Sequence, residues 1–212
     1  IYVRGGRSGG PDNFGYTYAN SKMPGGPTYD WIEIATNGLG TPILPSSDDS
    51  WVGNIDLGTD FFFNYYGTDY SQIAIGNNGL LFSGVGTWQY INQQIKQTPS
   101  IHGFIAPYWD DLVTWGSADA IYYQTQGAAP NRKFIVQWNN NQHYSSSSSG
   151  ITFEAILYEG TNNILFQYKD LDFGSVYGAV GGDNPPYNNG GSATVGIEDP
   201  TGADGLQYSF NK

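Results

Sequence analysis

Short apolar or alternating runs, separated by Gly, Asn, Asp and Pro, recur about every ten to fifteen residues along this chain, a spacing typical of short antiparallel strands. No helix-length segment separates them, which disfavours a parallel α/β sheet. We therefore expect an all-β fold: an antiparallel β-sandwich, jelly-roll-like, of about a dozen short strands with long polar loops. The clearest runs are 30–34, 72–75, 121–124, 133–138, 151–158, 164–168, 193–197 and 206–210.

Two turns predict hairpins. Residues 76–79 read Gly-Asn-Asn-Gly between two apolar runs, and Asn-Gly supplies the positive φ angles that tight hairpins require. Residues 159–163 separate two further runs in the same way. Long polar loops are expected at 145–150 and 174–192, which are rich in Ser, Gly, Asn and Pro.

A chain of 212 residues with this pattern suits one large β domain. We expect an N-terminal β segment and Gly-rich hinge over residues 1–10, followed by a single sandwich over residues 11–212. The sequence has no Cys, which excludes disulfides and thiolate metal sites and is common in bacterial and archaeal surface proteins.

No apolar run approaches the roughly 18 residues of a membrane helix, so the chain is not expected to be membrane-embedded. The sequence begins at Ile1 without an initiator Met. We interpret this as removal of a signal peptide and expect a prokaryotic extracellular or cell-surface protein. A trimmed chain, or a cytoplasmic protein without Cys, is the alternative.

The formal net charge is −11, which argues against nucleic acid as a partner because phosphate neutralisation needs a basic surface. Arg4 and Arg7 are the only charged residues among the first seven. Residues 8–212 then hold 6 basic and 19 acidic groups, or −13. A short cationic segment, residues 1–10, which we call the arm, therefore precedes an acidic remainder of the chain, which we call the body.

The amino terminus predicts self-association. The β-prone segment Ile1-Tyr2-Val3-Arg4 precedes a Gly-rich hinge that contains Arg7. A strand on a hinge can complete the sheet of a neighbouring copy, and such head-to-tail contacts can build a homopolymeric filament. An ordinary first strand or a disordered tail is the alternative reading of these residues.

Catalysis is not expected. Nucleophilic catalysis needs a base, and the only histidines, His102 and His143, lie at strand or loop edges where structural hydrogen bonding is the commoner reason for a His. Asp110 and Asp111 could suggest glycoside cleavage, but neighbouring residues of a strand point to opposite faces. A glycoside-active enzyme is therefore the least favoured interpretation.

Calcium is a candidate ligand, because acid-rich loops can supply the six to eight oxygen ligands that this ion takes. Such loops occur at 48–49 and 198–199, and around the candidate ligands Asp110, Asp111, Asp170 and Asp172. None forms a complete twelve-residue calcium loop, since the terminal Glu is missing. The metal site stays unassigned at this point.

Aromatic residues raise a second binding hypothesis, a carbohydrate-binding module that recognises surface glycans. Trp88, Tyr90 and Trp115 occupy turn-like settings where exposed rings could stack on sugars. Trp31 and Trp138 lie in clear runs and are expected in the core. The alternative is that large sandwiches use all such rings as core filler.

Residues 102–112 (HGFIAPYWDDL), with 121–125 and 134–140, resemble modules that are repeated in secreted prokaryotic surface proteins and appended to some exported proteases. Residues 153–160, 164–168 and 193–199 extend the resemblance to about residues 11–210, and it is loosely similar to the nidogen-type extracellular domain. The resemblance implies an extracellular structural or adhesive β module. It carries no catalytic residue to this chain.

Overall fold

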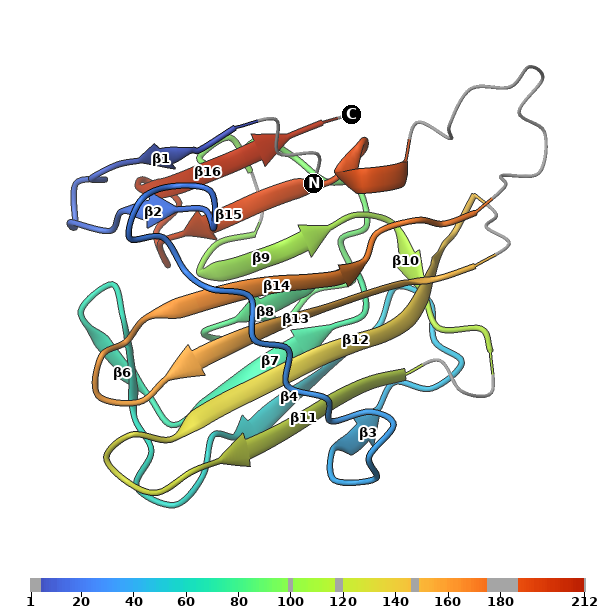
Figure 1. Cartoon of the computed structure of the whole chain (residues 1–212), viewed down its shortest axis with the longest axis horizontal. Helices are drawn as coiled ribbons and strands as arrows, with labels where there is room; N and C mark the ends of the chain where they lie inside the picture. The colour runs from blue at the N-terminus through green and yellow to red at the C-terminus, as the bar shows by residue number, and fades with distance from the viewer. Residues whose placement is uncertain (1–4, 99–100, 117–119, 146–148, 175–186, 212) are drawn as a thin grey trace.

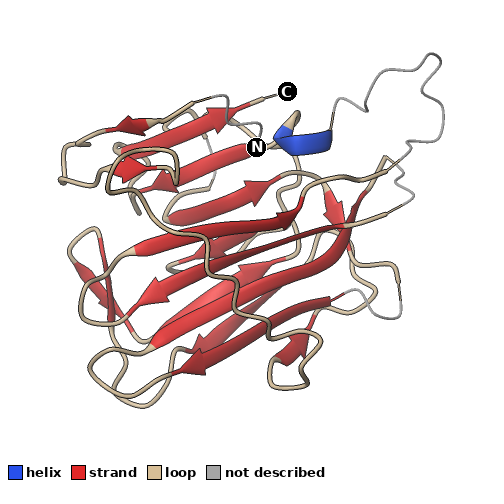
Figure 2. Cartoon of the chain, viewed as in Figure 1, coloured by secondary structure: helices blue, strands red, loops and turns tan. Residues whose placement is uncertain are grey.

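The computed structural model describes residues 5–98, 101–116, 120–145, 149–174 and 187–211, and these form two antiparallel sheets packed face to face (Figure 1). Strands dominate the described residues, and a single 3-10 turn, η1 (Asn188–Gly190), is the helical element among them (Figure 2). The predicted antiparallel β-sandwich is confirmed. The described residues contain sixteen strands, because several two- and three-residue strands add to the runs visible in the sequence.

Sheet 1 runs in the order β14-β13-β12-β11-β3, with β10 paired to the far end of β12. Its long strands follow one another in sequence and form a meander. The bounds are β3 Thr41–Ile43, β10 Leu112–Val113, β11 Ala120–Gln126, β12 Lys133–His143, β13 Ile151–Tyr158 and β14 Ile164–Asp170.

Sheet 2 runs in the order β16-β15-β9-β8-β7-β4. Two small ribbons, β1-β2 and β5-β6, accompany the sandwich. The bounds are β4 Trp51–Asp56, β7 Gln72–Gly76, β8 Leu80–Phe82, β9 Phe104–Trp109, β15 Thr194–Glu198 and β16 Gly205–Phe210, with β1 Ser8–Gly9, β2 Tyr18–Ala19, β5 Phe63–Tyr65 and β6 Thr68–Tyr70 in the ribbons.

Both predicted hairpins form, as β7-β8 and β13-β14. Gly79 in the first turn has φ +72, and a Cβ at this position would lie 1.8 Å from the carbonyl oxygen of Tyr108. The turn therefore requires glycine for both its backbone conformation and its close approach to β9.

The core lies between the sheets. Trp138 of β12 stacks on Phe153 of β13, with ring centroids 4.9 Å apart, and its indole nitrogen donates to the carbonyl of Gly76 on the opposite sheet at 3.0 Å. Trp138 is fully buried, as predicted. One side chain thus fills the core and also fixes the relative position of the two sheets.

Each sheet is covered on its outer face as well. A second apolar cluster on sheet 2 includes Phe82, Ile95 and Trp109, and a third on sheet 1 includes Ile34, Ile135 and Ile156. Burial on both faces explains why strands such as β9 read as continuous apolar runs rather than strict alternations.

The prediction of a strand at 30–34 is wrong. This segment crosses the outer face of sheet 1 as a strap (Figure 1, blue trace over β14 to β11) and joins no backbone ladder. Its alternate N–H groups donate to side chains of three neighbouring strands: Asp30 to Gln167 at 2.6 Å, Ile32 to Glu154 at 3.3 Å, and Ile34 to Gln137 at 2.9 Å. We call residues 28–35 the strap.

Trp31 also differs from expectation, because it lies on the strap and is only partly buried. Its ring stacks near that of Tyr29 and faces the Lys169 ammonium at 5.4 Å. No helix in the described part of the chain has the length and apolar character needed to span a bilayer.

Candidate functional site

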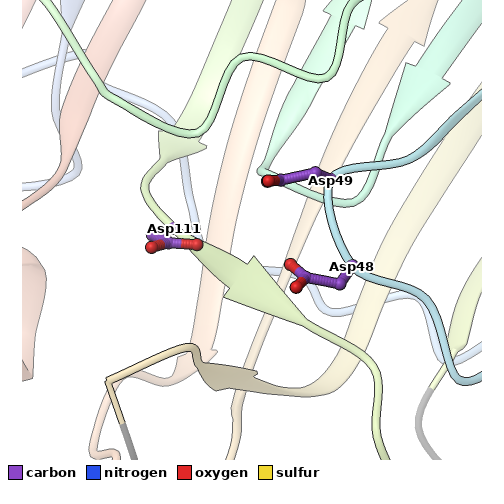
Figure 3. Close-up of side chains that lie close together, drawn as sticks. All are labelled: Asp48, Asp49 and Asp111. Carbon is purple, nitrogen blue, oxygen red and sulfur yellow. The ribbon is translucent and has the colours of Figure 1, made fainter.

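Three carboxylates meet at one end of the sandwich. Asp48 and Asp49 lie in the loop before β4, and Asp111 lies between β9 and β10 (Figure 3). Each offers an oxygen, and these oxygens lie within 4.8 Å of one another. We call Asp48, Asp49 and Asp111 the acidic triad.

The predicted Asn-Gly turn positions the triad. Asn77 and Asn78 are buried, and each bonds to both acid-bearing loops. Asn77 accepts from the N–H of Ser50 at 2.8 Å and donates to the carbonyl of Leu112 at 2.9 Å. Asn78 accepts from the N–H of Leu112 at 2.9 Å and donates to the Asp49 carboxylate at 2.9 Å. The hairpin therefore acts as a clamp between the two loops.

The surroundings of Asp111 disfavour its charge. Burial raises its pKa to about 6, His143 opposes the rise, and the carboxylates of Asp49, Asp48 and Asp110 add to it. A group of hard oxygen donors with a raised carboxyl pKa suits a hard divalent cation such as calcium. The triad supplies three of the six to eight ligands that calcium takes, so carbonyls and water would complete such a site.

Asp110 does not belong to the triad. Its side chain is buried, accepts from the hydroxyl of Ser192 and from the N–H of Asp111, and lies 3.5 Å from Nε2 of His143. The imidazole of His143 in turn stacks on Tyr187, with centroids 4.0 Å apart. Asp110 and Asp111 lie between β9 and β10 and make different contacts, although His143 acts on both.

Asp170 and Asp172 form a separate turn. The Asp170 carboxylate accepts from the N–H of Asp172 at 3.0 Å. The Asp172 carboxylate accepts from the N–H of Gly174 and from the amide of Asn188. Within the described ranges the triad is the one acidic group with metal-site spacing, so Asp111 is the single candidate ligand from the sequence that belongs to it.

Two pairs of exposed aromatic rings lie on segments whose backbone contacts the triad or its supports. Trp88 is 59% exposed and pairs with Tyr90, with centroids 6.5 Å apart. Trp115 and Tyr144 are each 50% exposed and pair at 5.6 Å. The carbonyl of Trp88 accepts from the Asn78 amide at 3.5 Å, and the N–H of Tyr144 donates to the Asp111 carbonyl at 2.9 Å.

The structure brings together residues that the sequence leaves apart. Asp48 and Asp49 stand out in the sequence only as one acid-rich loop among several, and nothing in the sequence singles out Tyr144. Their proximity to Asp111 and Trp115 depends on strand order.

The assembly segment is only partly described. Ile1, Tyr2, Val3 and Arg4 lie outside the described residues. Arg7 lies against β16, where its guanidinium donates to the carbonyl of Tyr208 at 3.4 Å and faces the Tyr208 ring at 5.7 Å. Residues Ser8 and Gly9 pair with β2 of the same chain.

Comparison with family models gives one match, to the NIDO-related family, over residues 17–212. The chain belongs to the NIDO-related family. This membership implies an extracellular module and agrees with the loose nidogen-type similarity of the sequence. No curated protein and no solved structure matched the chain. The matched range begins at residue 17 and so does not include the cationic arm.

Proposed function

We propose that this NIDO-related chain is a non-enzymatic structural or adhesive protein that associates with copies of itself through its N-terminal segment, building a surface filament. The observation that carries the proposal is the combination of a β-prone, glycine-hinged segment outside the family region with open edges on both sheets.

Each sheet has two edge strands, β14 and β3 in sheet 1 and β16 and β4 in sheet 2, and each of the four pairs with one strand among those described. An edge strand presents N–H and C=O groups that can pair with a strand from another chain. The proteins that use this mode gain affinity from the backbone bonds and specificity from side-chain pockets.

Charge supports the same association. The arm carries Arg4 and Arg7, whereas residues 8–212 carry a net charge of −13. A contact between the arm of one copy and the body of the next is heterologous, so it propagates into a filament unless its rotation closes a ring. Assembly is expected to weaken as salt screens this attraction.

Removal of residues 1–4 tests the proposal while sparing Arg7 and the β1-β2 ribbon. We expect the wild type to form polymers visible by electron microscopy and the shortened chain to sediment as a monomer. A matched control replaces Val3 with Ile, which keeps an apolar β-branched side chain. Unchanged polymers after deletion, or a wild type that stays monomeric at high concentration, would contradict the proposal.

The environments of the histidines and acids support a non-enzymatic function. Nδ1 of His102 lies 3.0 Å from the buried carboxylate of Glu198, and His143 is packed between Asp110 and Tyr187. The Asp110 carboxylate is bonded to Ser192, whereas Asp111 belongs to the acidic triad. Hydrolysis of a glycan panel that stops on Asp110→Asn or Asp111→Asn would contradict this part of the proposal.

A second candidate function is glycan binding at the acidic triad. The favouring observation is that two exposed ring pairs, Trp88–Tyr90 and Trp115–Tyr144, belong to segments whose backbone contacts Asn78 and Asp111. Rings can stack on sugar faces, and a cation held by the triad would bind sugar hydroxyls.

Glycan-array binding, with and without calcium, tests this second function. Trp88→Ala and Trp115→Ala are each expected to remove the signal. Tyr29→Ala is the matched control, because Tyr29 is 54% exposed and lies on the strap, away from the ring pairs. A blank array for the wild type would refute the glycan hypothesis.

A further inference from the structure

A groove of about 790 Å³ lies beside the free edge of β14. One side is formed by β14 itself and the other by the segment that contains β2, while β15 and β16 line it from sheet 2. Its apolar lining includes Phe166, Val195, Ile197 and Leu206. The groove therefore has two strand-bearing sides and an apolar floor.

Strand order shows what is missing from this groove. Strand β13 packs over β9, so the next strand outward in sheet 1, β14, corresponds to β15 in sheet 2. Sheet 2 continues to β16, whereas sheet 1 ends at β14. No described strand pairs with the outer edge of β14, and the groove lies along that edge; strand β2 closes its far side against β16, with the Tyr18 and Tyr208 rings 5.4 Å apart.

The burial of the strand residues also indicates that a strand is missing beside β14. The core-facing residues of β13, such as Phe153 and Leu157, are fully buried. The equivalent row on β14, including Phe166, is only partly buried, and so are all six residues of β16. Apolar surface that faces the core side of a sandwich but stays half exposed gains free energy when another strand covers it.

We propose that this groove is the acceptor site for residues 1–4 of a second copy of this chain, which add to β14 as the missing strand of sheet 1. The inference rests on the proposed self-association and specifies where it occurs. In a strand, Ile1 and Val3 share one face, suited to the apolar floor, and Tyr2 and Arg4 share the other.

The position of the chain's own arm favours a second copy as the donor. Residues 5–10 do not line the groove, and β1 pairs with β2 while the segment bearing β2 lines the groove. Arg7 of the arm bonds Tyr208, a residue of the groove lining, so the described part of the arm reaches the rim of the groove without lining it. A separate chain delivers its first four residues without disturbing the β1-β2 ribbon.

Disulfide trapping tests the site directly, because the chain has no Cys of its own. Full-length Val3→Cys is mixed with full-length Leu206→Cys under mild oxidation, and a covalent heterodimer is expected. The matched control pairs Val3→Cys with Val85→Cys, which is 80% exposed and lies outside the groove lining. The groove pair is expected to exceed the control yield by about tenfold, the ratio that a preference of about 1.4 kcal/mol produces.

A double variant, Val3→Cys with Leu206→Cys, distinguishes a second copy from the chain's own arm as the donor of the added strand. Transfer between copies gives a ladder of covalent oligomers, whereas a monomeric intramolecular disulfide would overturn the proposal. Polymers that form normally but give no excess cross-link at Leu206 would refute the groove and leave self-association standing. A wild type without polymers and without cross-links would refute both.

A second measurement guards against a folding defect in the cysteine variants. A peptide with the sequence of residues 1–7 is added in excess to the wild-type protein, with a scrambled peptide as control. Only the native sequence is expected to shorten the polymers and to shift amide resonances of β14 and β16. Equal effects of both peptides, or shifts confined to other strands, would contradict the proposal.

Discussion

Two buried glutamates bond the segments that cover the outer faces of the two sheets. They differ in how fully their own oxygens are hydrogen-bonded. Glu198 on sheet 2 accepts from the N–H of Lys96 on one oxygen and from the hydroxyl of Thr98 on the other, which also lies 3.0 Å from His102. Glu154 on sheet 1 bonds Ile32 and Gln167 through one oxygen, and its other oxygen has no partner.

The two side chains show that equal burial does not give equal hydrogen bonding. Burial raises the pKa of Glu154 to about 7; the hydrogen bonds from Ile32 and Gln167 oppose the rise, and the acids Glu33 and Asp30 add to it. The cover of sheet 2 is therefore held by a fully bonded carboxylate, whereas the strap is held by one that takes up a proton near neutral pH.

The largest expected effect concerns Glu198. Replacement by Ala leaves the N–H of Lys96 and the hydroxyl of Thr98 without their buried acceptor, and we expect the two unpaired donors together to cost about 3–5 kcal/mol in the free energy of unfolding. Urea denaturation measures it. Glu198→Gln keeps one acceptor oxygen and is expected to lose less; equal losses would show that the charge, not the acceptor geometry, is what matters.

The second-largest expected loss of stability concerns Gln137. Its amide accepts from the N–H of Ile34 and donates to Glu33. Gln137→Ala leaves a buried N–H unpaired, at an expected cost of about 2–3 kcal/mol. Hydrogen exchange should speed up at Ile34 first. Exchange that stays slow there would mean that the strap is held by the packing of its isoleucines alone.

The third effect is a pH dependence from Glu154. Its pKa is raised on folding, so the folded state binds the proton more tightly, and stability is greatest below about pH 4.5 and falls as pH rises toward 7. Glu154→Gln should flatten this fall by on the order of 1–2 kcal/mol.

Thermal melts at pH 5 and pH 8 compare the two proteins. The raised pKa of Asp111 gives a slope of the same sign, so Asp111→Asn is measured in parallel as the control. An identical slope in the wild type and Glu154→Gln would contradict the assignment to Glu154.

The smallest effect concerns Lys169, which pairs with Glu33 on the strap at 2.9 Å and is about half exposed. Lys169→Ala should cost no more than about 1 kcal/mol, because exposed ion pairs contribute little. The loss should shrink further in high salt. A salt-independent loss would point to the contact between Lys169 and the Trp31 ring instead.

The sequence predicts most of the sheets because period-two patterns and Asn-Gly turns act locally. Strands β7, β13 and β14 begin at the expected residues. The strap shows the limit of that reasoning. Residues 30–34 alternate like a strand because Ile32 and Ile34 cover an apolar face, but their N–H groups meet side chains instead of a ladder.

The candidate site was less predictable for a related reason. Asp111 was recognisable from its acidic, aromatic surroundings, whereas its neighbours Asp48 and Asp49 come from a loop that only sheet order brings near. Tyr144 pairs with Trp115 through the β10-β12 contact, which involves a strand of two residues. Such short pairings leave no periodic pattern in a sequence.

Because the strap binds sheet 1 through its main-chain N–H groups, its length is more tightly constrained than its amino-acid composition. The acceptors on Gln167, Glu154 and Gln137 stand on successive strands and engage every second peptide unit. A single inserted or deleted residue would move each later donor out of phase, while substitutions on the outward row, at Tyr29 and Trp31, leave the phase intact. The strap therefore tolerates substitution of its outward-facing side chains but not the insertion or deletion of a single residue.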